Sequence, residues 1–160
     1  MSPKHEEFER TALPHLRGLL RFARRLTGNP EQAEDLAQET FLLAWRGFSR
    51  FTPGTNIRAW LFRILLNAHR ERGRRRTALA LIKRPEAVAS EQQRIEVMDA
   101  LDRLPEDQRV VLALSVIEGF TGPEVAEILQ LPLGTVMSRL SRARQAMRSM
   151  LTPAFEKVSK

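Results

Sequence analysis

Cysteine is absent from the 160 residues of this chain. Without a thiol the protein can form no disulfide, use no thiolate nucleophile and bind no zinc through cysteine. No apolar run approaches the ~20 residues that a membrane-spanning helix needs, so we expect no membrane insertion. The first ten residues, MSPKHEEFER, carry charges with no hydrophobic segment behind them, unlike a secretory signal. These absences together lead us to expect a cytoplasmic protein.

Patterns typical of an enzyme are missing as well. The histidines, His5, His15 and His69, lie in separate segments without metal-ligand spacing, and no phosphate-binding glycine loop occurs. The acidic pair Glu106–Asp107 is explained by the preference for negative charge in the first turn of a helix. We therefore expect no catalytic residues, no metal, no cofactor and no enzymatic activity.

Positive charge is in excess and is unevenly distributed along the chain. Residues 1–78 contain fifteen Lys and Arg against eight Asp and Glu, a net charge of +7. Residues 79–132 contain five against ten, a net of −5, and residues 133–160 contain six against one, a net of +5. Two basic regions therefore flank an acidic stretch, and each basic region is a candidate nucleic-acid surface.

The periodicity of apolar residues is helical along almost the whole chain and nowhere alternates as in a strand, so the sequence predicts an all-α fold. Proline and glycine mark the expected helix boundaries. Before residue 121 we expect helices over residues 6–26 with a bend at Pro14, 30–48, 56–76 with fraying near Gly73, 92–103, and 105–118 with Pro105 at the first helical position.

Residues 77–91, TALALIKRPEAVASE, lack strong amphipathicity and contain Pro85, which predicts a flexible linker. The sequence therefore favours two small helical domains, residues 1–76 and 92–160. Domains of this size are marginally stable on their own, and packing onto a larger partner would stabilise both.

Residues 121–148 have the pattern of a helix-turn-helix. Thr121-x-x-Glu124 forms a capping box at the start of the first helix. Pro132 interrupts the chain, because proline cannot continue the preceding helix. A second helix is expected from about Gly134, with Val136, Leu140, Ala143 and Met147 on its buried side.

The opposite side of this second helix is rich in side chains that suit base edges and phosphates. These are hydroxyls, an amide and guanidinium groups, carried by Thr135, Ser138, Arg139, Ser141, Arg142 and Gln145. A helical hairpin with a solvated basic face remains the alternative at this point.

Several motifs in both halves of the chain resemble those of the extracytoplasmic-function (ECF) sigma factors, the two-domain promoter-recognition subunits of bacterial RNA polymerase. In the first half they are AEDLAQETFLLAW (33–45) and FTPGTNIRAWLFRILLNAHRERGRRR (51–76). In the second half they are LDRLPEDQRVVLAL (101–114), EVAEIL (124–129) and LPLGTVMSRLSRAR (131–144). GTNIRAWLFRIL and GTVMSRL look closest to the subgroup that controls thiol-oxidative stress.

The resemblance implies that the first domain is a sigma region 2 helical bundle, which recognises and melts the −10 promoter element. A flipped base loses stacking that a pocket must offset, and Asn67 matches the family position lining that pocket. Trp60 could stack on a base, although it falls on the buried side of its helix. The −10 contact residues that we expect are Asn56, Arg63, Asn67, Arg70 and Arg74.

The second domain, by the same resemblance, is a sigma region 4 helix-turn-helix that reads the −35 element in the major groove. Its expected DNA contacts are Thr121, Thr135, Ser138, Arg139 and Arg142. Arginine aligned on guanine discriminates between bases, whereas the threonines near helix amino ends are expected on phosphates.

The partners implied by the resemblance are core RNA polymerase, promoter DNA and an anti-sigma factor that holds a stress-responsive sigma factor inactive. Asp35, Gln38 and Glu39 share one helix face that would meet the beta-prime clamp helices, although the same face could be merely solvated. Two alternatives stay open: a sigma-like mimic that binds an anti-sigma factor, and a free-standing helix-turn-helix regulator. A mimic of this kind tends to lose the basic recognition face, which is present here.

Overall fold

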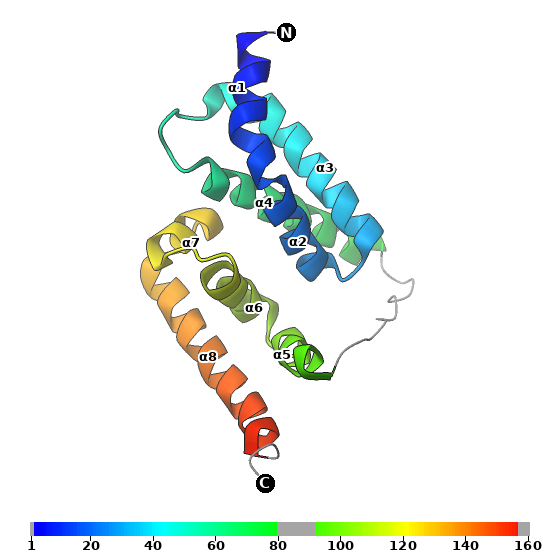
Figure 1. The fold of residues 1–160 in the computed structure, drawn as a ribbon, viewed down its shortest axis with the longest axis vertical. Helices are drawn as coiled ribbons and strands as arrows, with labels where there is room; N and C mark the ends of the chain where they lie inside the picture. The colour runs from blue at the N-terminus through cyan, green and yellow to red at the C-terminus, as the bar shows by residue number, and fades with distance from the viewer. Residues whose placement is uncertain (1, 80–91, 157–160) are drawn as a thin grey trace. The chain divides into compact units, whose positions relative to one another are not determined.

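The computed structural model describes residues 2–79 and 92–156 of the chain, and all regular structure within these ranges is helical (Figure 1). The fold class predicted from the sequence is therefore confirmed. The chain divides into two compact units, residues 1–86 and 87–160. The division falls inside the segment predicted as a linker, most of which lies outside the described residues.

The first unit begins with two helices joined by a short turn. Helix α1 (Pro3–Ala12) leads through a 3-10 turn, η1 (Leu13–His15), into α2 (Leu16–Thr27). The turn contains Pro14, where the sequence predicted a bend. Helix α2 ends at Gly28, whose φ of 65° is the left-handed conformation that glycine adopts without strain.

Helices α3 (Pro30–Gly47) and α4 (Ile57–Leu79) complete the first unit, with a 3-10 turn, η2 (Phe48–Arg50), between them. Asn29 caps α3 by accepting a hydrogen bond of 3.0 Å from the backbone N–H of Gln32, as its position before Pro30 indicates. The largest fully buried side chains of the unit come from α2, α3 and α4: Leu19, Phe22, Leu36, Leu61, Phe62, Leu65 and Leu66.

The expected fraying of α4 near Gly73 is wrong. The helix continues through Gly73 to Leu79, three residues beyond the predicted end at Arg76. One glycine costs a helix roughly 1 kcal/mol relative to alanine, which a helix of 23 residues tolerates.

The second unit is built from α5 (Gln92–Asp102), α6 (Glu106–Leu112), α7 (Gly122–Leu129) and α8 (Leu133–Glu156). Pro105 lies at the N-cap position just before α6, whereas the sequence predicted it at the first helical position. The helix predicted to reach Glu118 changes after Leu112 into a π-helical turn, η3 (Ala113–Ile117). The core of the second unit contains five fully buried side chains, those of Val111, Leu114, Val125, Ile128 and Val136.

Helices α7 and α8 form the predicted helix-turn-helix. Both halves of the capping box are present at Thr121 and Glu124. Gln130 ends α7 in the left-handed conformation, with a φ of 53°. A Cβ at Gly122 would lie 3.2 Å from Met137 Sδ, so the glycine allows α8 to pack closely against the start of α7.

None of the helices in the described part of the chain combines the length and apolar character that crossing a bilayer requires. No group of three metal-ligating side chains occurs among the same residues.

Candidate nucleic-acid interface

Helix α8 presents the polar face that the sequence predicted. Val136, Leu140 and Ala143 are buried against the rest of the second unit. Ser138 and Arg142 lie on the opposite side and are exposed, while Thr135 is half-buried beside them. The Ser138 hydroxyl donates to the carbonyl oxygen of Thr135 at 3.1 Å, one turn earlier. Hydroxyl and guanidinium groups are therefore available together on one helix face.

Arg139 lies at the edge of this face and has an acidic partner within the same unit. Its Nε is 3.4 Å from Oδ2 of Asp107, in the first turn of α6. The side chain of Arg139 is 28% exposed and that of Asp107 is 49% exposed. The sequence predicted Arg139 as a contact residue but gave no sign of this ion pair.

Thr121 has a structural explanation independent of DNA. Its hydroxyl donates to a carboxylate oxygen of Glu124 at 2.9 Å and accepts from the Glu124 backbone N–H at 3.4 Å. The backbone N–H of Thr121 donates to the same carboxylate at 2.7 Å. The side chain is exposed and also caps α7, so a phosphate would have to compete for its hydroxyl proton.

The five residues predicted to contact the −10 element lie along one face of α4. Arg63, Asn67, Arg70 and Arg74 follow one another at spacings of four, three and four residues, which aligns them on a helix. Arg63 is half-buried, whereas the other three are exposed. Asn56 lies at the start of the helix on the same face and caps it, since its Oδ1 accepts from the Ala59 backbone N–H at 3.0 Å. We define this set as the α4 stripe.

Arg72 lies between Arg70 and Arg74 in the sequence but points away from the α4 stripe. Its Nε and Nη2 each lie 2.6 Å from Oε2 of Glu39 on α3. The arginine therefore ties α4 to α3. This ion pair also engages one of the three residues predicted to bind polymerase.

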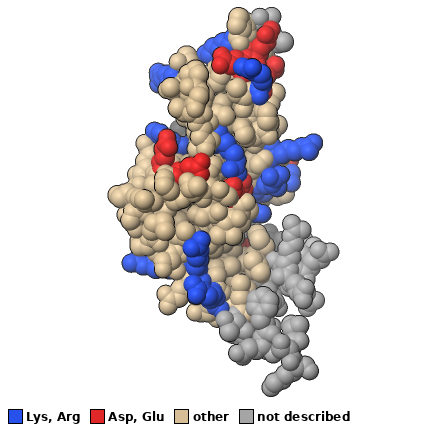
Figure 2. Space-filling view, turned by 60° about the vertical axis from the view of Figure 1, so that its left-hand side comes forward, with Lys and Arg blue, Asp and Glu red and all other residues tan. Residues whose placement is uncertain are grey.

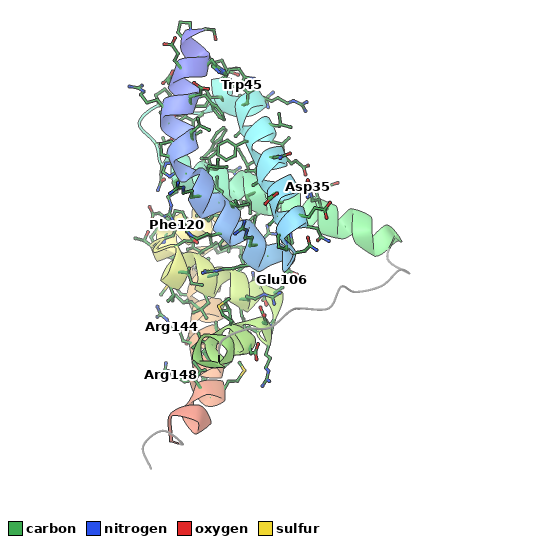
Figure 3. The ribbon with its side chains drawn as sticks, turned by 45° about the vertical axis from the view of Figure 1, so that its right-hand side comes forward. Asp35, Trp45, Glu106, Phe120, Arg144 and Arg148 are labelled. Atoms are coloured by element: carbon green, nitrogen blue, oxygen red, sulfur yellow. The ribbon has the colours of Figure 1, made fainter. Side chains whose placement is uncertain are left out.

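The residues predicted to bind polymerase, Asp35, Gln38 and Glu39, lie on the outer side of α3, from which Asp35 projects in Figure 3. Asp35 and Gln38 are exposed, and Glu39 is half-buried. Leu42, one turn beyond Gln38, is 58% exposed. Leu42 was not predicted as a site residue, although a leucine off the buried side of α3 indicates an exposed apolar contact. We call these four residues the α3 patch.

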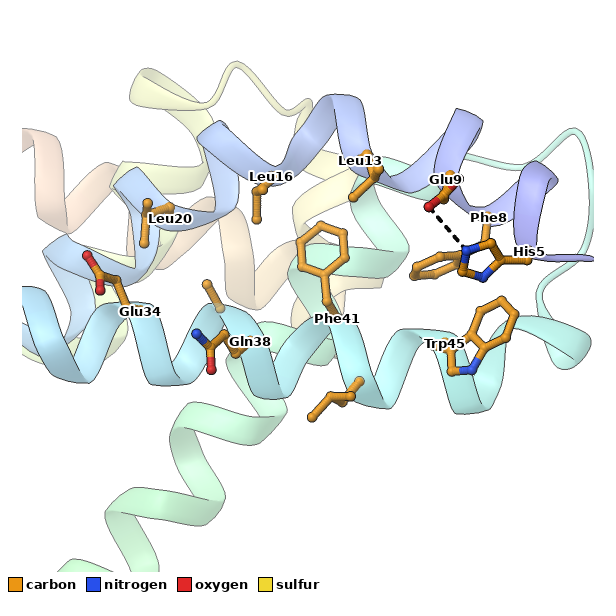
Figure 4. A pocket seen from close by; sticks show the side chains of 12 residues that line it. His5, Phe8, Glu9, Leu13, Leu16, Leu20, Glu34, Gln38, Phe41 and Trp45 are labelled. Carbon is orange, nitrogen blue, oxygen red and sulfur yellow. Dashed lines mark ion pairs between the residues drawn. The ribbon is translucent and has the colours of Figure 1, made fainter. Parts of the chain in front are cut away.

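An apolar groove runs beside the α3 patch, between α3 and the segment from α1 to α2 (Figure 4). It has a volume of about 760 Å³. Leu13, Leu16, Phe41 and Trp45 line it, and Gln38 and Leu42 belong to both surfaces. Leu13 and Leu16 are exposed at 46% and 40%. Figure 2 shows the Lys, Arg, Asp and Glu side chains in separate groups, with other side chains exposed between them.

Trp60 is half-buried and packs within the first unit. Its ring centroid lies 5.1 Å from that of Phe51, and one of its ring carbons is 3.6 Å from where a Cβ on Gly47 would stand. These contacts account for the side chain as part of the packing around the loop before α4.

The described helices combine an aligned cationic stripe in the first unit with a helix-turn-helix in the second, which defines the class of DNA-binding transcription proteins. Comparison with known families makes the class specific. The family "Sigma-70 region 2" matches residues 12–78, and "Sigma-70, region 4" matches residues 94–147.

The chain is similar to known sigma factors over most of its own length and most of theirs. The chain is 40% identical to the ECF RNA polymerase sigma factor EcfG of Rhodopseudomonas palustris, over 88% of this chain and 81% of that one. It is 31% identical to the RNA polymerase sigma-H factor of Pseudomonas aeruginosa, over 91% and 86%. The chain belongs to the ECF RNA polymerase sigma factors.

Solved structures agree with this assignment. The sigma factor RpoE of Bartonella quintana, in complex with the anti-sigma factor NepR, matches with a TM-score of 0.78 at 32% identity, covering 92% of this chain and 98% of that one. CnrH, in complex with the cytosolic domain of CnrY, matches with a TM-score of 0.71 at 31% identity, covering 93% and 90%. The resemblance to the thiol-oxidative-stress subgroup stays a prediction.

Proposed function

We propose that this chain directs core RNA polymerase to promoters by contacting the −10 element with its first unit and the −35 element with its second. Two cationic surfaces on two separate units, the α4 stripe and the polar face of α8, support this assignment most directly. The role is one of binding and positioning, without catalysis by the chain itself. We also propose a cytoplasmic location, since polymerase and chromosome are found there.

The polar face of α8 suits the major groove. Its exposed Arg142 carries a planar donor group that can bond guanine O6 and N7 together. Ser138 and Thr135 are short, so the helix backbone can approach the base edges closely. The Thr121 hydroxyl and the Gly122 backbone N–H suit a neighbouring phosphate, which would compete with Glu124 for the hydroxyl proton.

The α4 stripe suits single-stranded DNA. Its arginines neutralise phosphates, and the released counterions make such binding strongly salt-dependent. Asn67 lies between Arg63 and Arg70 and can both donate to and accept from a base edge. An unpaired base held at Asn67 and flanked by phosphate contacts would keep the −10 strand open.

The α3 patch and the adjoining groove suit a helical partner with basic and apolar residues. The exposed carboxylate of Asp35 offers charge complementarity, that of Glu39 is shared with Arg72, and exposed Leu42 offers apolar area. We propose the beta-prime clamp helices of the polymerase as this partner. The anti-sigma factor NepR, bound to RpoE in a similar solved structure, also supports a regulator that holds this chain inactive.

Run-off transcription with core polymerase tests the function, on promoters selected from a random upstream DNA library. Addition of the chain should produce initiation from promoters that share two spaced elements. Arg142→Ala should lower initiation about tenfold by weakening −35 recognition. Arg144→Ala is the matched control, because Arg144 is an exposed arginine on a different side of α8.

Asn67→Ala tests the melting role separately. We expect roughly tenfold less initiation on duplex promoters, and recovery on a template whose −10 region is already unpaired. If the chain binds polymerase but leaves the choice of start site unchanged, the proposed function is wrong and a sigma-like mimic is favoured. If initiation is promoter-specific but both variants behave normally, only the residue assignments fail.

A further inference from the structure

The ion pair between Asp107 and Arg139 joins the two helices that pack together in the second unit, α6 and α8. The carboxylate of Asp107 is itself held in place, because its Oδ1 accepts a hydrogen bond of 2.9 Å from the Gln108 backbone N–H. The other oxygen, Oδ2, lies 3.4 Å from Nε of Arg139. An anchored carboxylate therefore lies on one edge of the guanidinium group.

The carboxylate contacts the guanidinium group at Nε, and this position decides which of its N–H donors remain available to DNA. Arginine has five N–H donors in a rigid plane, and the Nε edge is distinct from the edge formed by Nη1 and Nη2. A carboxylate at Nε restrains rotation of the group and leaves the terminal edge for a second acceptor pair. Guanine offers such a pair in the major groove, at O6 and N7.

We infer that Asp107 is a positioning residue for −35 recognition, holding the Arg139 guanidinium through Nε so that its terminal edge can read a guanine. This inference rests on the proposed function. Restraint before binding reduces the conformational entropy that a flexible arginine loses when it is ordered on DNA. Asp107 therefore increases discrimination without touching the base.

The charge of Asp107 also affects how tightly the protein binds DNA of any sequence, and this effect is opposite in sign to its effect on base choice. A carboxylate beside a DNA-binding face repels phosphates and weakens binding to any sequence. Removing that charge should strengthen non-specific binding while it weakens the choice of base. The rise in non-specific binding follows from the charge alone, so the loss of base choice is the change that reports positioning, and a residue that served only to stabilise α6 would not produce it.

The test uses the full chain assembled with core polymerase and a promoter library randomised in the −35 element, with bound and unbound DNA sequenced. Asp107→Asn keeps an oxygen for the Gln108 N–H and removes the charge at Arg139. Preference for guanine should fall about three- to tenfold at the same position that Arg139→Ala affects. Binding to non-promoter DNA should rise about twofold.

Two further variants define the mechanism. In guanine preference, the double variant of Asp107→Asn and Arg139→Ala should match Arg139→Ala alone, because Asp107 acts on the base through Arg139. Asp102→Asn is the matched control, since Asp102 lies in the same unit and pairs with Arg109 at 3.9 Å. It should leave the base profile unchanged.

The outcomes separate this inference from the function on which it rests. If the unaltered holoenzyme shows no −35 preference, the proposed function fails. If it shows a preference that Arg139→Ala alters and Asp107→Asn does not, the positioning role is overturned. Additive effects on guanine preference in the double variant, or no effect of Arg139→Ala on that preference, overturn it as well.

Discussion

Several of the predicted contact residues are engaged by neighbours within the chain. Asn56 and Thr121 cap helices, Glu39 pairs with Arg72, and Arg139 pairs with Asp107. Residue type and helical spacing were sufficient to predict which faces these side chains occupy. They could not predict the partners, because each ion pair joins residues more than 30 positions apart in the sequence.

His15 is the residue for which the structure predicts a pH effect. Burial lowers its pKa below the usual 6.5, and the positive charge of Arg58 lowers it further. The unfolded chain therefore binds a proton more readily than the folded chain does. The stabilising contribution is complete above pH 6.5 and should be lost as the pH falls below it.

Urea unfolding followed by tryptophan fluorescence at a series of pH values between 7.5 and 5.5 measures this effect, since Trp45 and Trp60 both lie in the first unit. The free energy of unfolding should decrease less steeply with acidification in His15→Gln than in the unaltered chain. Identical pH dependence in the two proteins would contradict the assignment. Comparing variants removes the contributions of His5 and His69.

At the scale of the helices, the sequence predicted most of the elements and several of their ends. The bend at Pro14, the start of α3 at Pro30 and the capping box at Thr121 lie where the sequence placed them, because these signals act over only a few residues. The π-helical turn after Leu112 was not predicted. Such a turn depends on how a helix packs against its neighbours, and local propensity does not encode it.

Removal of the capping box tests an element of the DNA-binding unit. Thr121→Ala leaves the Glu124 backbone N–H without its acceptor, so the free energy of unfolding of the second unit should decrease by about 1 kcal/mol. Thr121→Ser keeps the hydroxyl and should retain most of the stability. Urea unfolding followed by circular dichroism measures both, and equal losses in the two variants would argue against a capping role.

At the scale of the whole molecule, each unit has a hydrophobic core of its own. The core of the first unit contains two fully buried phenylalanines and several leucines, among them Phe22 and Phe62. The largest fully buried side chains of the second unit are leucine, isoleucine and valines, such as Leu114 and Ile128. Smaller buried side chains remove less apolar surface from water and so contribute less stability.

Unfolding should therefore take place in two steps, with the second unit less stable than the first. Circular dichroism, which reports on both units, should show a loss of helix before tryptophan fluorescence, which reports on the first, changes. Val136→Ala, in the core of the second unit, should shift only the earlier step. A single transition that both probes follow together would contradict this expectation.

The amino-acid sequence by itself determined the helical class, the helix-turn-helix with its capping box, and the faces of α4 and α8 on which the candidate DNA contacts lie. These features depend on spacing and on interactions between residues close together in the chain. Only the tertiary structure decided that Asp107 holds Arg139, that Glu39 holds Arg72, and that a groove adjoins the α3 patch. Each of these requires side chains from separate helices to meet, and the packing of the helices brings them together.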